Sequence, residues 1–428
     1  MPLPVAIIGG GISGLAAAYY LGVGGVESVV IDGSERLGGL LFTDHISGCT
    51  VEGGADSWLA AKPWARELAG ELGLGSHVIG SNDAARGVRV LRHGKLVPYP
   101  HDMQLVVPRR LSTVWNSPLF SLATKVRMSA DWVRFAKSPK GDRSVAEFIR
   151  SHFGQGAVDY LADPLLSGIY GGDTEMLSAE AVLPKFVERE RSQGSLTRGI
   201  PKDAVSNAPV FESMRGGLGQ LVAALQPPRV LKGFADGLER SGRTWRVRVN
   251  ADWLNASRVI VACPAYRAAH LLNSSAPELS DLLSGVRYSS AHIVAMAFRD
   301  LKPLQGFGLL VPRKEGHNLM AATWVSTKFS GRVPAALQLV RAFFRQPSAD
   351  PVRELGDVAG FHSEPEFVKE YRWPNSLPQY AVGHLALVKQ IEAVAAQTEG
   401  LHLIGNTYNG VGIPDCIRLA KQVVGSLG

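Results

Sequence analysis

The sequence contains few cysteines and no long apolar run, and each of these absences excludes a class of protein. Three cysteines occur in 428 residues, at positions 49, 263 and 416, too far apart for a disulfide framework or a metal cluster. No stretch of 18 apolar residues occurs, so we expect no transmembrane helix. The chain enters a predicted strand at residue 5, which leaves no room for a signal peptide. We therefore expect a protein of a reducing compartment, the cytoplasm.

Charge and composition narrow the function further. Apolar residues make up 46% of the chain and charged residues 19%, which allows a sizeable core, and the length suggests two or three domains. The net charge is +7, but the basic residues are scattered and form no run interleaved with aromatics. Nucleic acid is therefore the least expected partner, and an anionic membrane surface or an acidic small molecule fits better. The 47 glycines follow no triplet period, which excludes a collagen.

The strongest local pattern lies in the first forty residues. Residues 5–8 predict a buried strand, residues 15–21 predict a helix, and residues 28–31 predict a second strand. Between the first strand and the helix stands Gly-Gly-Gly-Ile-Ser-Gly, which fills the three glycine positions of a G-x-G-x-x-G motif. Because a strand and a helix flank the motif as it requires, the pattern predicts a dinucleotide-binding site.

The chemistry of such a site explains each residue of the motif. Gly9 allows a tight turn, Gly11 lets a pyrophosphate approach the backbone, and Gly14 lets the helix pack closely on the strand. The start of the helix offers free N–H groups and a partial positive charge to the phosphates. Asp32 ends the second strand, where its carboxylate can accept hydrogen bonds from ribose hydroxyls.

The string that follows the second strand indicates which dinucleotide is bound. Residues 32–39 read Asp-Gly-Ser-Glu-Arg-Leu-Gly-Gly. An arginine followed by a glycine pair at this place resembles the two-dinucleotide-binding flavoproteins of the amine oxidase type. The resemblance implies FAD. It also implies that Arg36 meets the pyrophosphate and that Gly38 and Gly39 let the loop pass over it.

Beyond residue 50 the pattern alternates between helices and strands. Residues 112–191 are mainly helical, and Ser144 followed by Glu147 forms a capping box before an apolar run. A strand that ends in glycines near residue 405 leads into a C-terminal helix, which is a second helix start suited to phosphate or ring oxygens. The other predicted helices and strands are a helix at 63–74, a hairpin at 88–100, strands at 230–234, 244–249, 258–264, 286–299 and within 307–344, a helix at 384–397 and a strand at 401–406.

Four further strings, in the same order along the chain, resemble the flavin-dependent protoporphyrinogen oxidases of haem biosynthesis, which belong to the amine oxidase superfamily. The similarity runs from residue 5 to residue 424, is weaker over 313–333, and leaves the chain shorter than is usual for that family. The strings are residues 164–173 (PLLSGIYGGD, with Leu177 and Ser178 after it), 306–312 (GFGLLVP), 377–380 (LPQY, with Gly383 and His384 after it) and 405–416 (GNTYNGVGIPDC).

The resemblance implies an α/β fold with mixed α+β character, in three discontinuous parts. FAD is expected to bind without a covalent link, and Cys416 is interpreted as part of a helix core. The parts are a Rossmann-type FAD-binding domain (1–85, 213–282 and 385–428), a mixed β-sheet substrate-binding domain (86–100, 203–212 and 283–384) and an inserted helical domain of the membrane-associated type (101–202).

The activity that the resemblance implies is the six-electron oxidation of protoporphyrinogen IX to protoporphyrin IX, with dioxygen as acceptor and hydrogen peroxide as product. Conjugation of the product drives this reaction, so no strong protein base is required, and we nominate no catalytic nucleophile–base pair and no metal. His317 and His384 are interpreted as structural histidines. The site must supply an apolar slot and a cation for the propionates.

Candidate site residues follow from the motifs and from the resemblance. Either Arg89 or Arg92 is expected to bind a substrate carboxylate, because the register there is uncertain by a residue. Gly168 and Ile169 are expected to approach the flavin and the macrocycle, and Phe307, Leu309 and Met320 to line the slot. The predicted cofactor residues are Gly9, Gly11, Ile12, Ser13, Gly14, Asp32, Gly33, Arg36, Gly38, Gly39, Gly54, Ala55, Asp56, Ser57, Val230, Cys263, Gly405, Asn406, Val411, Gly412 and Ile413.

Alternative functions remain open at this point. The first is oxidation of coproporphyrinogen III to coproporphyrin III by the same mechanism, for which a wider and more basic site is expected. The second is another flavoenzyme on the same scaffold, such as an amine oxidase or a carotenoid desaturase. The third is a flavin-binding or membrane-docking protein without activity. Peripheral contact with the inner face of the membrane and a homodimer are compatible with all of them.

Overall fold

The computed structural model describes residues 2–135, 138–200 and 208–427 of the chain. These form two compact units, one of residues 1–81, 209–288 and 386–428 and one of 82–208 and 289–385. Residues 203–207 of the expected substrate domain, and residues 136–137 and 201–202 of the expected helical domain, lie outside the described residues. The expected helical domain does not form a unit of its own, because it shares the second unit with the substrate sheet.

A parallel five-stranded sheet forms the centre of the first unit. Its strand order is β12-β2-β1-β16-β22, and β1 pairs on one side with β2 and on the other with β16. The central strands are short apolar runs, and all four residues of β1 are buried, as expected for a parallel sheet that is covered on both faces. The strands are β1 (Val5–Ile8), β2 (Ser28–Asp32), β12 (Val230–Lys232), β16 (Arg258–Val261) and β22 (Leu401–Leu403).

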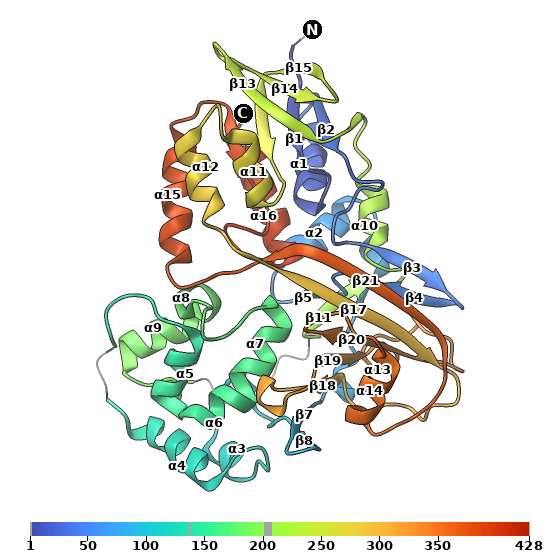
Figure 1. Ribbon diagram of the computed structural model, residues 1–428, viewed down its shortest axis with the longest axis vertical. Coiled ribbons are helices and arrows are strands. Elements are labelled where there is room, and N and C mark those ends of the chain that lie inside the picture. Colours follow the sequence, from blue (N-terminus) through green and yellow to red (C-terminus); the bar gives the residue numbers. More distant parts are fainter. Residues whose placement is uncertain (1, 136–137, 201–207, 428) are drawn as a thin grey trace. The chain divides into compact units, whose positions relative to one another are not determined.

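Both faces of this sheet are covered (Figure 1). One core contains Ile7, Leu15 and Ile417 and lies under α1 (Ile12–Val23), α2 (Trp64–Glu71), α10 (Gly219–Ala224) and α16 (Ile413–Gly425). The other core contains Ile8 and Trp245. It lies under α11 (Ala265–Leu272), α12 (Pro277–Ser284), α15 (His384–Ala396) and the antiparallel strands β13 (Ala235–Ser241), β14 (Thr244–Val249) and β15 (Asp252–Ala256). This two-sided cover agrees with the predicted Rossmann-type arrangement.

Smaller strands complete the first unit. A hairpin of two strands and a three-stranded sheet of order β5-β11-β6 follow the second strand of the large sheet. The buried Glu212 carboxylate of β11 accepts a hydrogen bond from Trp58 Nε1 at 3.1 Å. These elements are β3 (Thr43–Ile46), β4 (Cys49–Glu52), β5 (Trp58–Leu59), η1 (Gly75–His77), β6 (Val78–Gly80) and β11 (Phe211–Met214).

A mixed seven-stranded sheet of order β21-β17-β20-β19-β18-β7-β8 forms the centre of the second unit. β7 and β18 pair in parallel, whereas β7–β8, β18–β19, β19–β20 and β17–β20 are antiparallel. We did not predict β21, because its three prolines and charged residues break the alternating pattern, but an edge strand tolerates proline. The strands are β7 (Val88–Arg92), β8 (Lys95–Pro98), β17 (Tyr288–Phe298), β18 (Gly308–Leu310), β19 (Leu319–Trp324), β20 (Gln338–Phe344) and β21 (Pro365–Pro378).

The predicted helical stretch is present, and it packs directly on this sheet. Ser144 Oγ accepts the backbone N–H of Glu147 at 3.1 Å, as the capping box predicts. Asp163 Oδ2 accepts the backbone N–H of Arg313 at 3.0 Å, and this bond and the packing of α7 on β18 and β19 explain why helices and sheet form one unit. The helices are α3 (Leu111–Trp115), α4 (Leu122–Ala130), η3 (Asp131–Val133), α5 (Val145–Phe153), α6 (Gln155–Ala157), η4 (Val158–Ala162), α7 (Asp163–Tyr170), α8 (Ala179–Val182) and α9 (Pro184–Gln193).

The remaining short elements of the second unit flank the sheet and the helices. Leu355 and Val358 of α14 pack on one face of the sheet, in a core with Leu309 and Val340. Within the described parts of the chain, every helix falls short of the length or the hydropathy that a membrane span needs. The short elements are η2 (Asp83–Ala85), β9 (Met103–Gln104), β10 (Val107–Pro108), η5 (Arg313–Glu315), α13 (Val325–Lys328) and α14 (Pro351–Ala359).

Candidate functional site

The glycine turn after β1 has the geometry that its sequence predicts. Gly9 has a φ of +113°, which side-chain-bearing residues rarely adopt. A Cβ on Gly14 would lie 1.9 Å from the Gly9 carbonyl oxygen, so this glycine is required for the helix to pack against the turn. A Cβ on Gly11 would instead meet no atom within 4 Å, so the backbone here borders open space that an approaching group could occupy.

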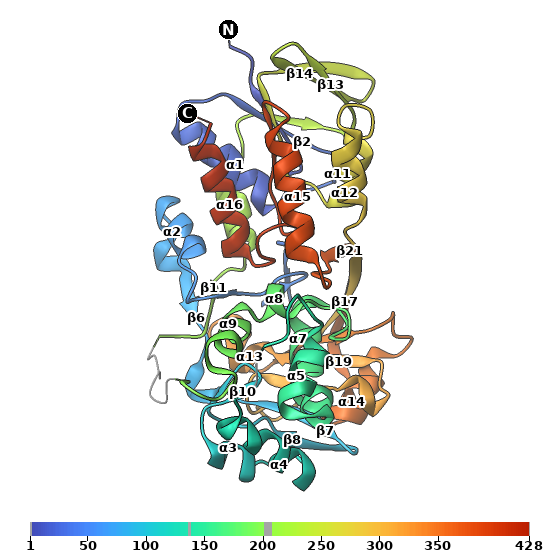
Figure 2. The same cartoon turned by 90° about the vertical axis from the view of Figure 1, so that its left-hand side faces the viewer.

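Two helices begin side by side at this turn. α1 and α16 pack along each other (Figure 2), and the Ser13 side chain hydrogen-bonds to the Cys416 thiol. Among the described residues, neither helix start has a side-chain cap, and both are preceded by a glycine, Gly11 and Gly412. No side-chain cap from the described residues therefore competes with an anionic ligand at either start, although Pro414 contributes no N–H in α16, and both helix dipoles favour negative charge there.

The start of α16 also carries a buried carboxylate, which forms an ion pair with a lysine. Asp415 lies in the first turn and accepts two hydrogen bonds from Lys62 Nζ, at 2.6 and 2.8 Å. A Cβ on Gly410 would lie 2.5 Å from this carboxyl group, so the glycine turn closes tightly over it. Cys416 is buried, and burial raises the pKa of its thiol to about 11, which confirms the expected core role.

Asp32 lies where a ribose-binding carboxylate is expected. It ends β2, and its Oδ2 accepts the Gly10 backbone N–H at 2.5 Å while its Oδ1 accepts that of Ser34 at 2.7 Å. The carboxylate therefore stands directly beside the glycine turn. A Cβ on Gly33 would lie 2.6 Å from the Phe234 ring, so the chain leaves β2 in close contact with a neighbouring aromatic residue.

Two more predicted segments converge on the same turn. Gly38 donates its N–H to the Gly10 carbonyl at 2.7 Å, and a Cβ on Gly39 would lie 3.3 Å from the Gly11 Cα. A Cβ on Gly54 would lie 2.0 Å from the Leu40 carbonyl oxygen, which brings the segment 54–57 against the same loop. In that segment Ser57 Oγ donates to Asp56 Oδ1 at 2.7 Å, and the Asp56 carbonyl accepts Ser213 Oγ at 2.6 Å.

The carboxyl ends of β16 and β22 supply the remaining predicted residues. Cys263 follows β16, and burial raises the pKa of its thiol to about 12, so it is not poised as a nucleophile. Gly405 follows β22 with a φ of +135°, and a Cβ there would meet nothing within 4 Å. In this loop Thr407 Oγ1 hydrogen-bonds to the Tyr288 hydroxyl at 2.7 Å. Ligands of open α/β sheets bind at these strand ends.

A pocket of about 520 Å³ lies beside the loop that follows β2. Arg36 and Val230 line it, together with residues of β3 and α10, and both belong to the predicted cofactor set. All the predicted cofactor residues lie in the first unit, and the open glycine turn and the two helix starts fit an anionic dinucleotide, with the Asp32 carboxylate beside them.

The second unit holds the predicted substrate residues, which differ in exposure. Arg89 of β7 is exposed, and it pairs in register with Leu309, which is buried in the core under α14. Arg92 Nη1 donates to the Pro118 carbonyl at 2.5 Å. On α7, Ile169 is half exposed and a Cβ on Gly168 would meet nothing within 4 Å, so this end of the helix borders open space. Phe307 is buried and Met320 is partly buried.

The two histidines interpreted as structural differ in the second unit. His384 is buried, and its ring stacks on that of Tyr380 with 4.0 Å between centroids. His317 is exposed, and its backbone carbonyl, not its ring, accepts Arg345 Nε at 3.4 Å, so a structural role of this imidazole stays a prediction.

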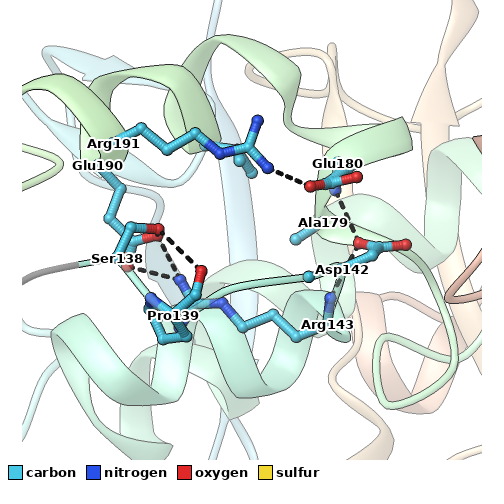
Figure 3. A pocket seen from close by; sticks show the side chains of 10 residues that line it. Ser138, Pro139, Asp142, Arg143, Ala179, Glu180, Glu190 and Arg191 are labelled. Carbon is cyan, nitrogen blue, oxygen red and sulfur yellow. Dashed lines mark hydrogen bonds and ion pairs between the residues drawn. The ribbon is translucent and has the colours of Figure 1, made fainter.

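A buried ionic cluster, which the sequence analysis missed, stands in the helical stretch. His152 of α5 contacts Asp131 Oδ1 through Nδ1 at 2.5 Å and Glu190 Oε1 through Nε2 at 2.8 Å, and all three side chains are buried. Arg143 binds both oxygens of Glu190 at 2.5 Å, beside Ser138 (Figure 3). The two ring nitrogens of His152 thus bridge two buried carboxylates.

Hydrogen bonds hold both carboxylates of this cluster ionised. Burial opposes ionisation of Asp131, but the bonds from His152, Thr197 and Ser195 outweigh it and lower its pKa to about 2. Glu190 is likewise buried, and bonds from His152 and Arg143 lower its pKa to about 2. The members stand on η3, α5 and α9, up to 59 positions apart in the sequence, so no local spacing could have revealed them.

The chain is similar to known proteins along nearly its whole length. The family model described as flavin containing amine oxidoreductase matches residues 12–426. The coproporphyrinogen III oxidase of Bacillus subtilis is 32% identical over 98% of this chain and 97% of its own length. The protoporphyrinogen oxidase of Bos taurus is 28% identical over 98% of this chain and 97% of its own length. A crystal structure from Exiguobacterium sp. 255-15 superimposes with a TM-score of 0.89 at 28% identity and covers 100% of this chain and 99% of that one.

Proposed function

Because the chain belongs to the family of flavin containing amine oxidoreductases, we propose that it is an FAD-dependent porphyrinogen oxidase. The observation that carries the proposal is the glycine turn of the first unit, which borders open space and at which two uncapped helices begin. It occurs in a chain whose similarity to porphyrinogen oxidases spans nearly its whole length. Oxidation of a porphyrinogen to a porphyrin removes three hydrides and three protons. Three molecules of dioxygen would accept them as three of hydrogen peroxide.

The residues of the first unit would hold the cofactor. The N–H groups that begin α1 and α16 would bind the pyrophosphate and a ring oxygen, and Asp32 would bind the ribose. When bound, FAD supplies the hydride acceptor. The chain then has to orient the macrocycle and exclude water. Because the gain in conjugation drives the oxidation, no strong protein base is required.

We propose coproporphyrinogen III as the first substrate to test and protoporphyrinogen IX as the second. The sequence analysis placed them in the opposite order. Three relatives at 30% identity or above, from Bacillus subtilis, Propionibacterium freudenreichii and Mycobacterium leprae, are coproporphyrinogen III oxidases, which supports the new order. A substrate with four carboxylates is also attracted more strongly than one with two by a protein of net charge +7.

Substrate contacts would come from the second unit. The exposed Arg89 guanidinium can form a charge-assisted bond to a carboxylate, whereas Arg92 already donates to a backbone carbonyl. We therefore favour Arg89 of the two candidates. Gly168 and Ile169 would face the apolar ring, because they border open space on α7.

The test is anaerobic bleaching of the FAD-loaded protein by each porphyrinogen, followed by porphyrin fluorescence in air. Bleaching by coproporphyrinogen III faster than by protoporphyrinogen IX is expected, and the reverse order would restore the earlier preference. Holoprotein that neither compound bleaches would overturn the function.

Arg89→Ala should raise KM by about 10- to 100-fold, for a lost bond of roughly 1.5–3 kcal/mol. Arg299→Ala, an exposed arginine paired with Glu366, is the matched control.

We also propose a peripheral contact with anionic membranes, through exposed apolar side chains in the helical stretch of the second unit. Residues 103–141 contain seven lysines and arginines and one acidic residue, Asp131, which is buried. Exposed apolar side chains among basic ones favour an anionic bilayer surface. The exposed apolar side chains of this segment include Leu111, Trp115, Leu122, Val126, Val133 and Phe135.

Vesicle sedimentation tests this contact. The protein should bind phosphatidylglycerol vesicles and not phosphatidylcholine vesicles, and Val126→Glu should weaken binding. Val23→Glu, at a similarly exposed valine of the first unit, should not. Equal behaviour of the two vesicle types, or of the two variants, would argue against the contact.

A further inference from the structure

Arg36 is bound by its own loop. Its Nη2 donates to the Gly39 carbonyl at 2.8 Å, and its Nη1 donates to the carbonyls of Leu37 and Leu41 at 3.1 and 3.3 Å. The guanidinium also lies 4.1 Å from the centroid of the Phe42 ring. The turn of residues 37–42 therefore wraps around the cation, and three of the donors in its fork are directed at backbone carbonyls.

This turn touches the dinucleotide motif directly. Gly38 donates to the Gly10 carbonyl at 2.7 Å and forms a β-bridge with Gly11. Gly38 and Gly39 have φ values of +102° and +57°, and two consecutive residues in that region make a turn with many alternative conformations. A planar cation that hydrogen-bonds to three carbonyls of the turn would favour one of these conformations over the others. Three hydrogen bonds thus join the Arg36 guanidinium to the turn that contacts Gly11.

We propose that Arg36 is a positioning residue, which holds the Gly38–Gly39 turn against the Gly9–Gly14 turn and thereby shapes the cofactor site through the backbone. The alternative, implied by the family resemblance, is that its charge binds the pyrophosphate directly. The proposal rests on FAD binding by the first unit, which is part of the proposed function. It does not depend on which substrate is oxidised.

The two roles predict different behaviour of a lysine. Lysine keeps the charge, but its single ammonium group cannot reproduce a planar fork that reaches three carbonyls. For a positioning role, Arg36→Lys and Arg36→Met should weaken FAD binding to the apoprotein alike, by about tenfold. Both should also lower the melting temperature of the FAD-free protein, by about 3 °C, because the turn is held without the cofactor. Phe42→Leu should lower it in the same direction while leaving the charge in place.

The measurements are FAD titration of the apoprotein by flavin fluorescence, at low and high salt, and thermal unfolding of the FAD-free protein. Arg229→Lys, an exposed arginine of the same unit paired with Glu27, is the matched control and should change neither quantity. The proposal is overturned if Arg36→Lys keeps wild-type affinity while Arg36→Met loses it, with both FAD-free proteins as stable as the wild type. Holoprotein that binds FAD normally but oxidises no porphyrinogen would overturn the proposed function and leave this inference standing.

Discussion

The glycine turns of the first unit and the ionic cluster of the second place polar groups in the interior by opposite means. Around Gly9 and Gly14 the chain removes side chains, so that backbone groups approach one another and a ligand. Around His152 it inserts charged side chains and pairs each of them. The first means depends on excluded volume and fails when atoms are added. The second depends on charge balance and fails when a partner is removed.

The largest effect is expected for Gly14→Val. The added Cβ would lie 1.9 Å from the Gly9 carbonyl oxygen, so α1 could not dock on β1. We expect loss of FAD binding and a loss of stability above about 4 kcal/mol, measured by denaturant unfolding. Gly22→Ala in the same helix is the control, since its Cβ meets nothing within 4 Å, and it should raise stability by roughly 0.5–1 kcal/mol. If Gly14→Val and Gly22→Ala had the same stability and FAD binding, excluded volume would not explain the glycine turn.

His152→Gln tests the other half. A neutral amide removes the ring that bridges the two carboxylates. Glu190 keeps Arg143, but the buried Asp131 loses its His152 contact, and breaking a buried pair costs roughly 3–5 kcal/mol. Urea unfolding followed by tryptophan fluorescence would measure the loss. FAD affinity should remain unchanged, because the cluster lies in the second unit. His45→Gln, at an exposed histidine of the first unit, should be close to neutral, and a similarly small change at His152 would contradict the ionic interpretation.

Gly11→Val should separate binding from folding. Its Cβ would meet no protein atom, so the FAD-free protein should unfold like the wild type. The side chain would occupy the space that the pyrophosphate needs, and FAD affinity should fall by about 100-fold, or ~2.7 kcal/mol. Absorbance of the purified protein and FAD titration measure the effect. If the purified variant carried a full complement of FAD, the cofactor would not approach this glycine.

The smallest effect concerns pH. The carboxylates of Asp131 and Glu190 have pKa values of about 2 in the folded protein, below the ordinary values near 4 of the unfolded chain. Their contribution to stability is therefore present above about pH 4.5 and is lost progressively as the pH falls toward 2. Unfolding free energy measured between pH 6 and pH 3 should fall less steeply in His152→Gln. Parallel profiles would disprove the assignment.

Local sequence reasoning succeeded where sterics act over a few residues. The glycine spacing from Gly9 to Gly14 and the apolar run of β1 predict the turn and the strand, because each constraint lies within one element. The Ser144 cap is confirmed for the same reason. The fourteen-residue β21 was missed, because its prolines are tolerated only at a sheet edge, and edge position is decided by distant strands.

The sequence by itself determined that the chain has a dinucleotide-binding turn on an α/β unit, since glycine spacing, a strand, a helix and one carboxylate within forty residues predict that site together. The choice of FAD came from the family resemblance. Only the tertiary structure decided how charge is arranged. It placed His152 between two acids far apart in the chain, paired Lys62 with Asp415, and turned Arg36 into its own loop. Excluded volume acts between neighbours in sequence, whereas the pairing of buried charges depends on which elements the fold brings together.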